Sequence, residues 1–228
     1  PLMGVLRGLD GPDRLIAKGE PLPAFDCHCP LLSLPLAFGT TVETIPAPQT
    51  YIAADPDRVA AWQDRLGAKD MPRVGLAWRG NPENGSDSSR SMGLALMSRL
   101  CTAGITWFSL HNDLLEGEAE VLAAHPEIQH FGEEMNFVET AALIEHLDLV
   151  VSVDTAIAHL AGALGREVWI PLRYKPDWRW LLGREDSPWY PSARLFRQKT
   201  RGAWEGVLDE ISRALRARFR PGTQARRR

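Results

Sequence analysis

The stretch DLVVSVDTAIAHLAGA, residues 148–163, encodes a strand, a tight turn and a helix in succession. Residues 149–153 are apolar except for one serine and are rich in valine. A run this short predicts a buried strand of a parallel sheet rather than a buried helix. Asp154 and Thr155 carry oxygens suited to a helix N-cap, and apolar residues then recur at helical spacing up to Gly165, which suits the position after a helix end. Such a unit presents backbone N–H groups and a positive dipole end to an anion.

The first turns of this predicted helix offer a ligand-binding face. Thr155, Ala158 and His159 lie on one side, because residues three and four apart are neighbours on a helix. A hydroxyl, a gap beside a small residue and an imidazole suit a phosphate- or nucleotide-bearing ligand. The alternative is that Asp154 and Thr155 only cap the helix and that His159 is a structural residue.

Length, charge and cysteine content exclude several classes of protein. The 228 residues suffice for one large domain or one and a half smaller ones. A net charge of −3 argues against a general nucleic-acid binder. No apolar run approaches the roughly 18 residues that span a bilayer, and the first residues lack a signal peptide. Three cysteines favour a reducing cytoplasm. The arginine-rich residues 213–228 predict either a solvated terminal helix or a contact with anionic lipid, which would place the chain at the periphery of the inner membrane.

Two short patterns suggest a metal site at first sight. Cys27, His28 and Cys29 alternate, so on a strand they point to opposite sides, and no second ligand pair follows. The pair Asp55 and Asp57 has the spacing of a carboxylate metal motif, but a helix cap explains it. We therefore expect no metal and no cofactor.

The chain divides at about residue 70. The pattern of residues 1–70 predicts a partial N-terminal α/β segment with a linker. It predicts a helix over 2–9, a short strand over 14–17 and a helix over 56–67. Residues 27–46 are expected to form a buried connecting segment that includes a short helix near 31–38. The chain has no initiator Met and opens on a helix, so we expect that an upstream strand is missing.

Residues 71–228 alternate strands with helices of about ten residues. This rhythm predicts the α/β class, with a doubly wound, Rossmann-like parallel sheet. Ligands of such sheets bind outside the carboxyl ends of the strands. The most polar segments follow predicted strands, which indicates one composite cleft formed by residues 79–81, 90–91, 109–113, 154–155 and 173–190.

Three segments resemble the donor-binding half of a GT-B glycosyltransferase: VGLAWRGNP at 74–82, NFVETAALIEHLDLVVSVDTAIAHLAGALG at 136–165, and PLRYKPDWRWLLGREDSPWYP at 171–191. The likeness is to glycosyltransferase family 9, the ADP-heptose:lipopolysaccharide heptosyltransferases, and to related bacterial glycosyltransferases with tetratricopeptide (TPR) repeats upstream. This chain has Ala156 where that family often has Gly.

The resemblance implies roles for individual residues. The expected donor-binding residues are Trp78, Arg79, Gly80, Arg90, Ser109, His111, Met135, Asn136, Asp154, Thr155, Ala158 and His159. Arg90 would neutralise the departing diphosphate; otherwise it is a solvated loop arginine. Met135 would contact the base or pack in the core.

The acceptor side and the catalytic base are less defined by the resemblance. Tyr174, Trp178 and Trp180 suit stacking on sugar faces, and equally a buried partner surface. In such enzymes the catalytic base lies early in the chain, in a region that would here precede Pro1. Within the present sequence, Asp26 and His28 are the candidates for this base. The alternatives are a capping Asp26 and a core His28.

The resemblance implies an inverting, metal-independent glycosyltransferase. It would transfer a sugar from a nucleotide-diphosphate sugar to a hydroxyl of a glycan, a lipid-linked acceptor or a protein, with a TPR segment upstream as a partner. The alternative is a non-catalytic nucleotide-sugar or carbohydrate-binding module, or a truncated transferase fragment.

Overall fold

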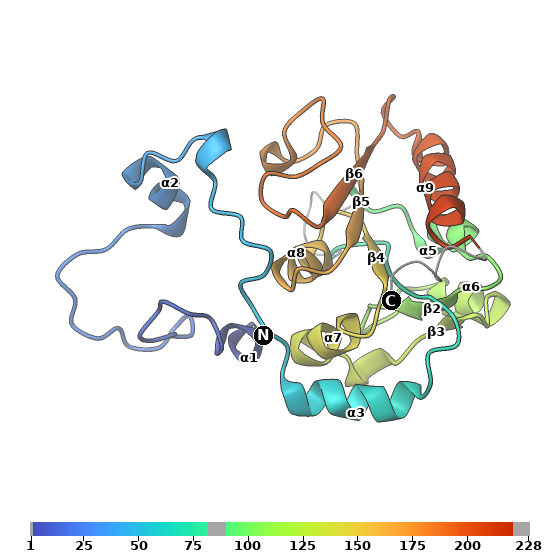
Figure 1. Cartoon of the computed structure of the whole chain (residues 1–228), viewed down its shortest axis with the longest axis horizontal. Helices are drawn as coiled ribbons and strands as arrows, with labels where there is room; N and C mark the ends of the chain where they lie inside the picture. Colours follow the sequence, from blue (N-terminus) through green and yellow to red (C-terminus); the bar gives the residue numbers. More distant parts are fainter. Residues whose placement is uncertain (1, 82–89, 221–228) are drawn as a thin grey trace.

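The computed structural model describes residues 2–81 and 90–220 and contains one six-stranded sheet. All of its strands are parallel, in the order β3-β2-β1-β4-β5-β6 (Figure 1). The strands are β1 (Arg73–Ala77), β2 (Thr106–Ser109), β3 (Ile128–Gln129), β4 (Leu149–Ser152), β5 (Val168–Leu172) and β6 (Ala193–Arg197). The predicted doubly wound α/β fold is confirmed.

Two hydrophobic cores lie on opposite faces of the sheet because strand side chains alternate. In β1, Val74 and Leu76 enter one core and Ala77 enters the other; in β4, Val151 and Val150 divide in the same way. Figure 1 shows α7 and α8 on one side of the strands and α5 and α9 on the other. These strands are fully buried, which explains why they form nearly continuous apolar runs.

The helices of this domain largely match the predicted ranges. They are α5 (Leu94–Met97), α6 (Glu118–Ala124), α7 (Phe137–Ile144), α8 (Ala156–Ala163) and α9 (Trp204–Arg218). The helix predicted from residue 114 begins later because Gly117 adopts a left-handed conformation (φ 82°) immediately before it. A 3₁₀ turn, Ser98–Leu100, follows α5.

The N-terminal segment differs from the prediction in three ways. Its helices are α1 (Met3–Leu6), α2 (Leu34–Ala37) and α3 (Pro56–Leu66), with 3₁₀ turns at Leu31–Ser33 and Val42–Thr44, so the first helix is shorter than predicted. The predicted strand over 14–17 is wrong: described residues 2–72 contribute no strand to the sheet. Residues 27–46 are mostly exposed rather than buried, and Leu32 and Leu36 are each 87% exposed.

The linker before α3 is attached to the end of α8. The Ala163 carbonyl accepts hydrogen bonds from the Tyr51 N–H (3.0 Å) and the Thr50 hydroxyl (3.1 Å). Gly165, with φ 70°, follows α8 in close contact with this linker: a Cβ there would lie 2.5 Å from the Gln49 carbonyl oxygen. Within the described ranges, no helix is long and apolar enough to cross a membrane.

Candidate functional site

The centre of the sheet is the topological switch point of the fold. The crossover from β1 leads outward to β2 and β3, whereas β4 lies on the other side of β1 and continues to β5 and β6. Ala77 pairs with Ser152, and the Val153 N–H donates to the Ala77 carbonyl at 2.9 Å. Residues 78–80 and 154–155 therefore leave the sheet side by side. Ligands of doubly wound sheets bind in this crevice.

The N-terminus of α8 faces this crevice. Thr155 is its N-cap, and the Thr155 Oγ1 accepts from the Ile157 N–H at 3.2 Å. Thr155 and Ala158 are buried, while Ala156, the first helical residue, is exposed. The predicted cap is confirmed, and the positive end of the helix dipole is accessible at Ala156.

Asp154 and His159 meet on this first turn. His159 Nε2 lies 3.7 Å from Asp154 Oδ1, and His159 Nδ1 lies 2.9 Å from the Tyr190 hydroxyl. Burial raises the pKa of Asp154, but the hydrogen bonds and charges of the neighbouring His159, Trp180 and Arg179 outweigh burial and lower it below the ordinary value. The Asp154 carboxylate is therefore ionised and oriented.

Trp78 and Arg79, at the end of β1, are engaged by protein groups. The Trp78 indole N–H donates to Glu118 Oε1 at 2.5 Å. The buried Arg79 guanidinium pairs with Glu118 (Nε to Oε1, 3.3 Å) and with Asp113 (Nη2 to Oδ1, 3.0 Å). These residues thus attach the end of β1 to the start of α6.

The chain returns to the crevice at residues 90–92. The Gly80 N–H donates to Ser91 Oγ at 3.2 Å, and the Met92 N–H donates to the Trp78 carbonyl at 3.0 Å. Arg90, which is half-buried, immediately precedes these two attached residues. Residues 82–89 of the predicted polar loop lie outside the described residues.

His111 and Ser109 form a buried network beside Trp78. His111 Nε2 accepts from the Trp78 backbone N–H at 3.2 Å, and Ser109 Oγ accepts from the His111 N–H at 3.3 Å. Ser109 Oγ also lies 3.1 Å from His130 Nδ1. Burial, with the Arg79 charge as a smaller cause, lowers the pKa of His111 to about 3. Its imidazole is therefore a neutral acceptor within the protein.

A cavity of about 520 Å³ opens between the end of β2 and the starts of α7 and α8. Its volume falls within the range of ligand pockets. Met135 is buried and lines the cavity, and Asn136 caps α7 by accepting from the Val138 and Glu139 N–H groups. The full lining is Leu110, Asn112, Met135, Asn136, Phe137, Val138, Thr140 and Ile157. Of these residues, Met135 and Asn136 are predicted from the sequence to bind the donor. Asn112 lies within the polar segment 109–113, which the sequence analysis places at the cleft.

The remaining predicted site residues lie in different surroundings. Asp26 and His28 are exposed, so the alternative of a core histidine does not apply. Tyr174 and Trp178 are also exposed, whereas Trp180 is fully buried. In the part of the chain that the structure describes, no group of three His, Cys, Asp or Glu side chains could hold a metal ion.

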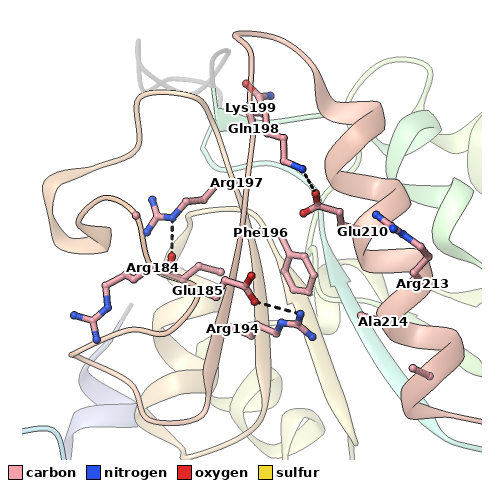
Figure 2. A pocket seen from close by; sticks show the side chains of 13 residues that line it. Arg184, Glu185, Arg194, Phe196, Arg197, Gln198, Lys199, Glu210, Arg213 and Ala214 are labelled. Atoms are coloured by element: carbon pink, nitrogen blue, oxygen red, sulfur yellow. Dashed lines mark hydrogen bonds and ion pairs between the residues drawn. The ribbon is translucent and has the colours of Figure 1, made fainter.

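A second groove, of about 850 Å³, lies between β6 and α9 on the outer edge of the sheet (Figure 2). Its cations are matched by protein groups: Arg194 pairs with Glu185 at 3.3 Å, and Lys199 pairs with Glu210 at 2.7 Å. Arg197 donates to backbone carbonyls, including that of Arg184 at 2.9 Å. This groove is not at the switch point, and we assign it no ligand.

Comparisons with known proteins agree with this architecture. Residues 94–169 match the model of glycosyltransferase family 9 (heptosyltransferase). Protein FlbA of Caulobacter vibrioides is 31% identical over 187 residues, which cover 77% of this chain and 30% of FlbA. The chain therefore spans less than a third of the length of this curated relative.

Two solved structures share the fold. The E. coli ADP-heptose LPS heptosyltransferase II superposes with a TM-score of 0.54 at 17% identity, covering 77% of this chain and 55% of that one. A family 9 glycosyltransferase from Veillonella parvula superposes with a TM-score of 0.50 at 8% identity, covering 76% and 48%. The resemblance to glycosyltransferase family 9 is thus confirmed over residues 94–169, and the sheet has the Rossmann-like α/β fold of these proteins.

Proposed function

We propose that this chain binds the nucleotide-diphosphate sugar of a GT-B glycosyltransferase, which transfers the sugar to an acceptor hydroxyl with inversion and without a metal ion. The observation that carries the proposal is the crevice at the switch point. The start of α8, the pair Asp154 and His159, and the segment 90–92 converge there, beside a cavity of about 520 Å³.

The cavity is suited to a base and a ribose. Leu110, Met135 and Ile157 line it with apolar surface that can cover the faces of a base. Asn112 and Asn136 add amide groups that can contact ribose hydroxyls. The cavity also ends at α8, so a diphosphate attached to the ribose would extend toward the helix N-terminus.

The diphosphate would lie at Ala156, where the exposed start of α8 favours negative charge. Arg90 would add a positive charge that stabilises the leaving group, which is the task a metal ion performs in other transferases. Asp154, being ionised, would accept hydrogen bonds from sugar hydroxyls rather than contact phosphate. The buried Arg79 would act indirectly, by holding the end of β1.

The acceptor hydroxyl must lose its proton to a base within hydrogen-bond reach. Asp26 and His28 stay the predicted candidates, and both are exposed in the N-terminal segment. The same proposal includes three further points. The acceptor is a glycan, a lipid-linked molecule or a protein. A TPR segment lies upstream, and the protein is cytoplasmic, with peripheral contact with the inner membrane. No cofactor is expected.

The test is calorimetric titration of the chain with ADP, UDP and GDP in the presence of EDTA. We expect saturable binding of one nucleotide, and about ten- to hundredfold weaker binding in Arg90→Ala, because a charged hydrogen bond to phosphate is lost. Arg213→Ala is the matched control, since Arg213 lines the groove between β6 and α9. Absence of binding, or an equal loss in the control, would contradict the proposal.

The second candidate is a non-catalytic nucleotide-sugar-binding module. It is favoured by the exposure of both candidate bases. A nucleotide-release assay with the matching nucleotide sugar separates the two: release that depends on an added acceptor supports the transferase, whereas binding without release supports the module.

A further inference from the structure

Tyr190 reaches α8 from the long loop between β5 and β6. Its hydroxyl lies 2.9 Å from His159 Nδ1, and its ring packs on Gly162, three residues later on the same helix face. A Cβ on Gly162 would lie 2.5 Å from the Tyr190 ring, so this glycine makes room for the tyrosine. Helix and loop are therefore fitted to each other at this point.

We propose that Tyr190 is a positioning residue: its hydroxyl donates to His159 Nδ1 and thereby places the proton of the neutral form of the imidazole on Nε2, directed at Asp154. The proposal deepens the proposed function and rests on it, because Asp154 and His159 stand at the predicted donor site.

The surroundings of His159 determine where the proton lies. Nε2 faces Asp154 Oδ1 at 3.7 Å, and Asp154 is ionised. With the proton on Nδ1, the Nε2 lone pair would face this carboxylate and repel it. With the proton on Nε2, an N–H group faces the carboxylate and Nδ1 accepts from Tyr190.

Two further observations support Tyr190 as the donor. Burial, and then a hydrogen bond with the neighbouring Tyr51 hydroxyl, raises the pKa of Tyr190, so its phenol keeps its single proton. When Tyr190 donates that proton to His159, Tyr51 is the donor to the Tyr190 oxygen. Trp180, which is fully buried, lies nearly parallel to the imidazole, with ring centroids 5.4 Å apart and an interplanar angle of 14°. The stacking limits rotation of the ring, and the Tyr190 hydrogen bond selects its tautomer.

The consequence is a carboxylate of fixed orientation at the start of α8. Asp154 is restrained by an N–H group whose position depends on Tyr190, a residue 31 positions from His159. Loss of the Tyr190 hydroxyl would leave the aromatic packing intact and free the imidazole to exchange tautomers. Nucleotide-sugar contacts made by Asp154 would weaken accordingly.

The experiment compares wild type, Tyr190→Phe and Tyr51→Phe by ¹H–¹⁵N NMR of the histidine ring nitrogens at pH 8. The chain has six histidines, and the signals of His159 are identified by their loss in His159→Gln. Tyr51→Phe removes a hydroxyl that interacts with the Tyr190 hydroxyl but not with the imidazole, so it tests whether the tautomer depends on the Tyr190 hydroxyl itself.

We expect His159 in wild type and Tyr51→Phe to be protonated at Nε2 alone, and Tyr190→Phe to show a mixture of tautomers. Affinity for the nucleotide sugar should fall about two- to tenfold in Tyr190→Phe, the loss of one neutral hydrogen bond. A proton on Nδ1 in wild type, or an unchanged tautomer in Tyr190→Phe, would overturn the inference. Failure of wild type to bind any nucleotide would instead reject the proposed function. The tautomer measured by NMR would still decide whether Tyr190 positions His159.

Discussion

His111 is neutral in the folded protein at neutral and mildly acidic pH, because burial lowers its pKa from 6.5 to about 3. In the unfolded chain the same imidazole binds a proton below about pH 6.5. Below that pH the unfolded state therefore binds more protons than the folded state. The free energy of unfolding must fall as the pH drops from about 6.5 toward 3.

This dependence can be measured by urea denaturation between pH 7 and pH 4. We expect His111 to contribute a loss of up to about 1.4 kcal/mol per pH unit below pH 6. His111→Gln keeps a side-chain acceptor for the Trp78 N–H but does not titrate, so its stability should fall less steeply. Equal slopes for the two proteins would show that His111 is protonated in the folded state.

Arg79 and His111 also show why single residues were the hardest part to predict. Both follow strands that end at the expected crevice, which is why sequence reasoning assigned them to the ligand. Their partners are remote: Glu118 is 39 residues from Arg79, and Trp78 is 33 residues from His111. Local spacing carries no information on such pairs, so it could not show that protein groups already satisfy these side chains.

Helix starts, in contrast, follow local rules, and the predicted caps at Asp55 and Thr155 are confirmed. An N-cap bonds to N–H groups two and three residues ahead, so the sequence contains the whole interaction. The wrong strand over 14–17 is the opposite case. An extended segment becomes a strand only when another segment pairs with it, and the sequence of the segment itself does not supply that partner.

The cap of α3 gives a prediction at this scale. Asp55 accepts hydrogen bonds from the Asp57 N–H (3.0 Å) and the Arg58 N–H (3.1 Å). Asp55→Ala should lower the free energy of unfolding by about 1 kcal/mol, whereas Asp55→Asn, which keeps an acceptor oxygen, should change it little. Thermal or urea denaturation of the three proteins tests this. No loss in Asp55→Ala would show that the bonds do not form, and equal losses in both variants would show that the charge of Asp55 stabilises the helix rather than its acceptor oxygen.

At the scale of the whole molecule, the sheet domain and the N-terminal segment differ in exposure. Residues 22–38 include six large apolar side chains that are at least 59% exposed: Leu22, Phe25, Leu31, Leu32, Leu36 and Phe38. The strands, in contrast, are mostly buried. The prediction of a buried segment was wrong because apolar composition shows what can be buried, not whether a surface is present to cover it.

Brief digestion with chymotrypsin, followed by mass spectrometry, tests this difference. We expect the first cuts after aromatic or leucine residues of the 22–38 segment, because cleavage needs exposed backbone with few tertiary contacts. The region from β1 to β6 should resist for longer. First cuts within the sheet would show that the N-terminal segment is packed against another surface in solution.

The alternation of strands and helices was sufficient to predict a parallel sheet, but the order of its strands depends on pairing between distant segments. β1 pairs with β2 on one side and with β4 on the other. The Arg73 N–H donates to Asp148, a residue 75 positions away. Because β1 and β4 are neighbours at the centre of this order, the switch point lies beside residues 154–155. The alternation of strands and helices therefore predicts the location of the crevice only when the central position of β1 is also known.

The central position of β1 has a consequence for the time course of folding. During synthesis β1 leaves the ribosome well before β4, and until β4 follows it can pair only on its β2 side. The other edge of a strongly apolar strand is then open to incorrect pairing while the intervening chain is made. Closure of so long a loop is also slow compared with helix formation. We therefore expect the joining of β1 to β4, at the very place where the crevice forms, to be a late step of folding.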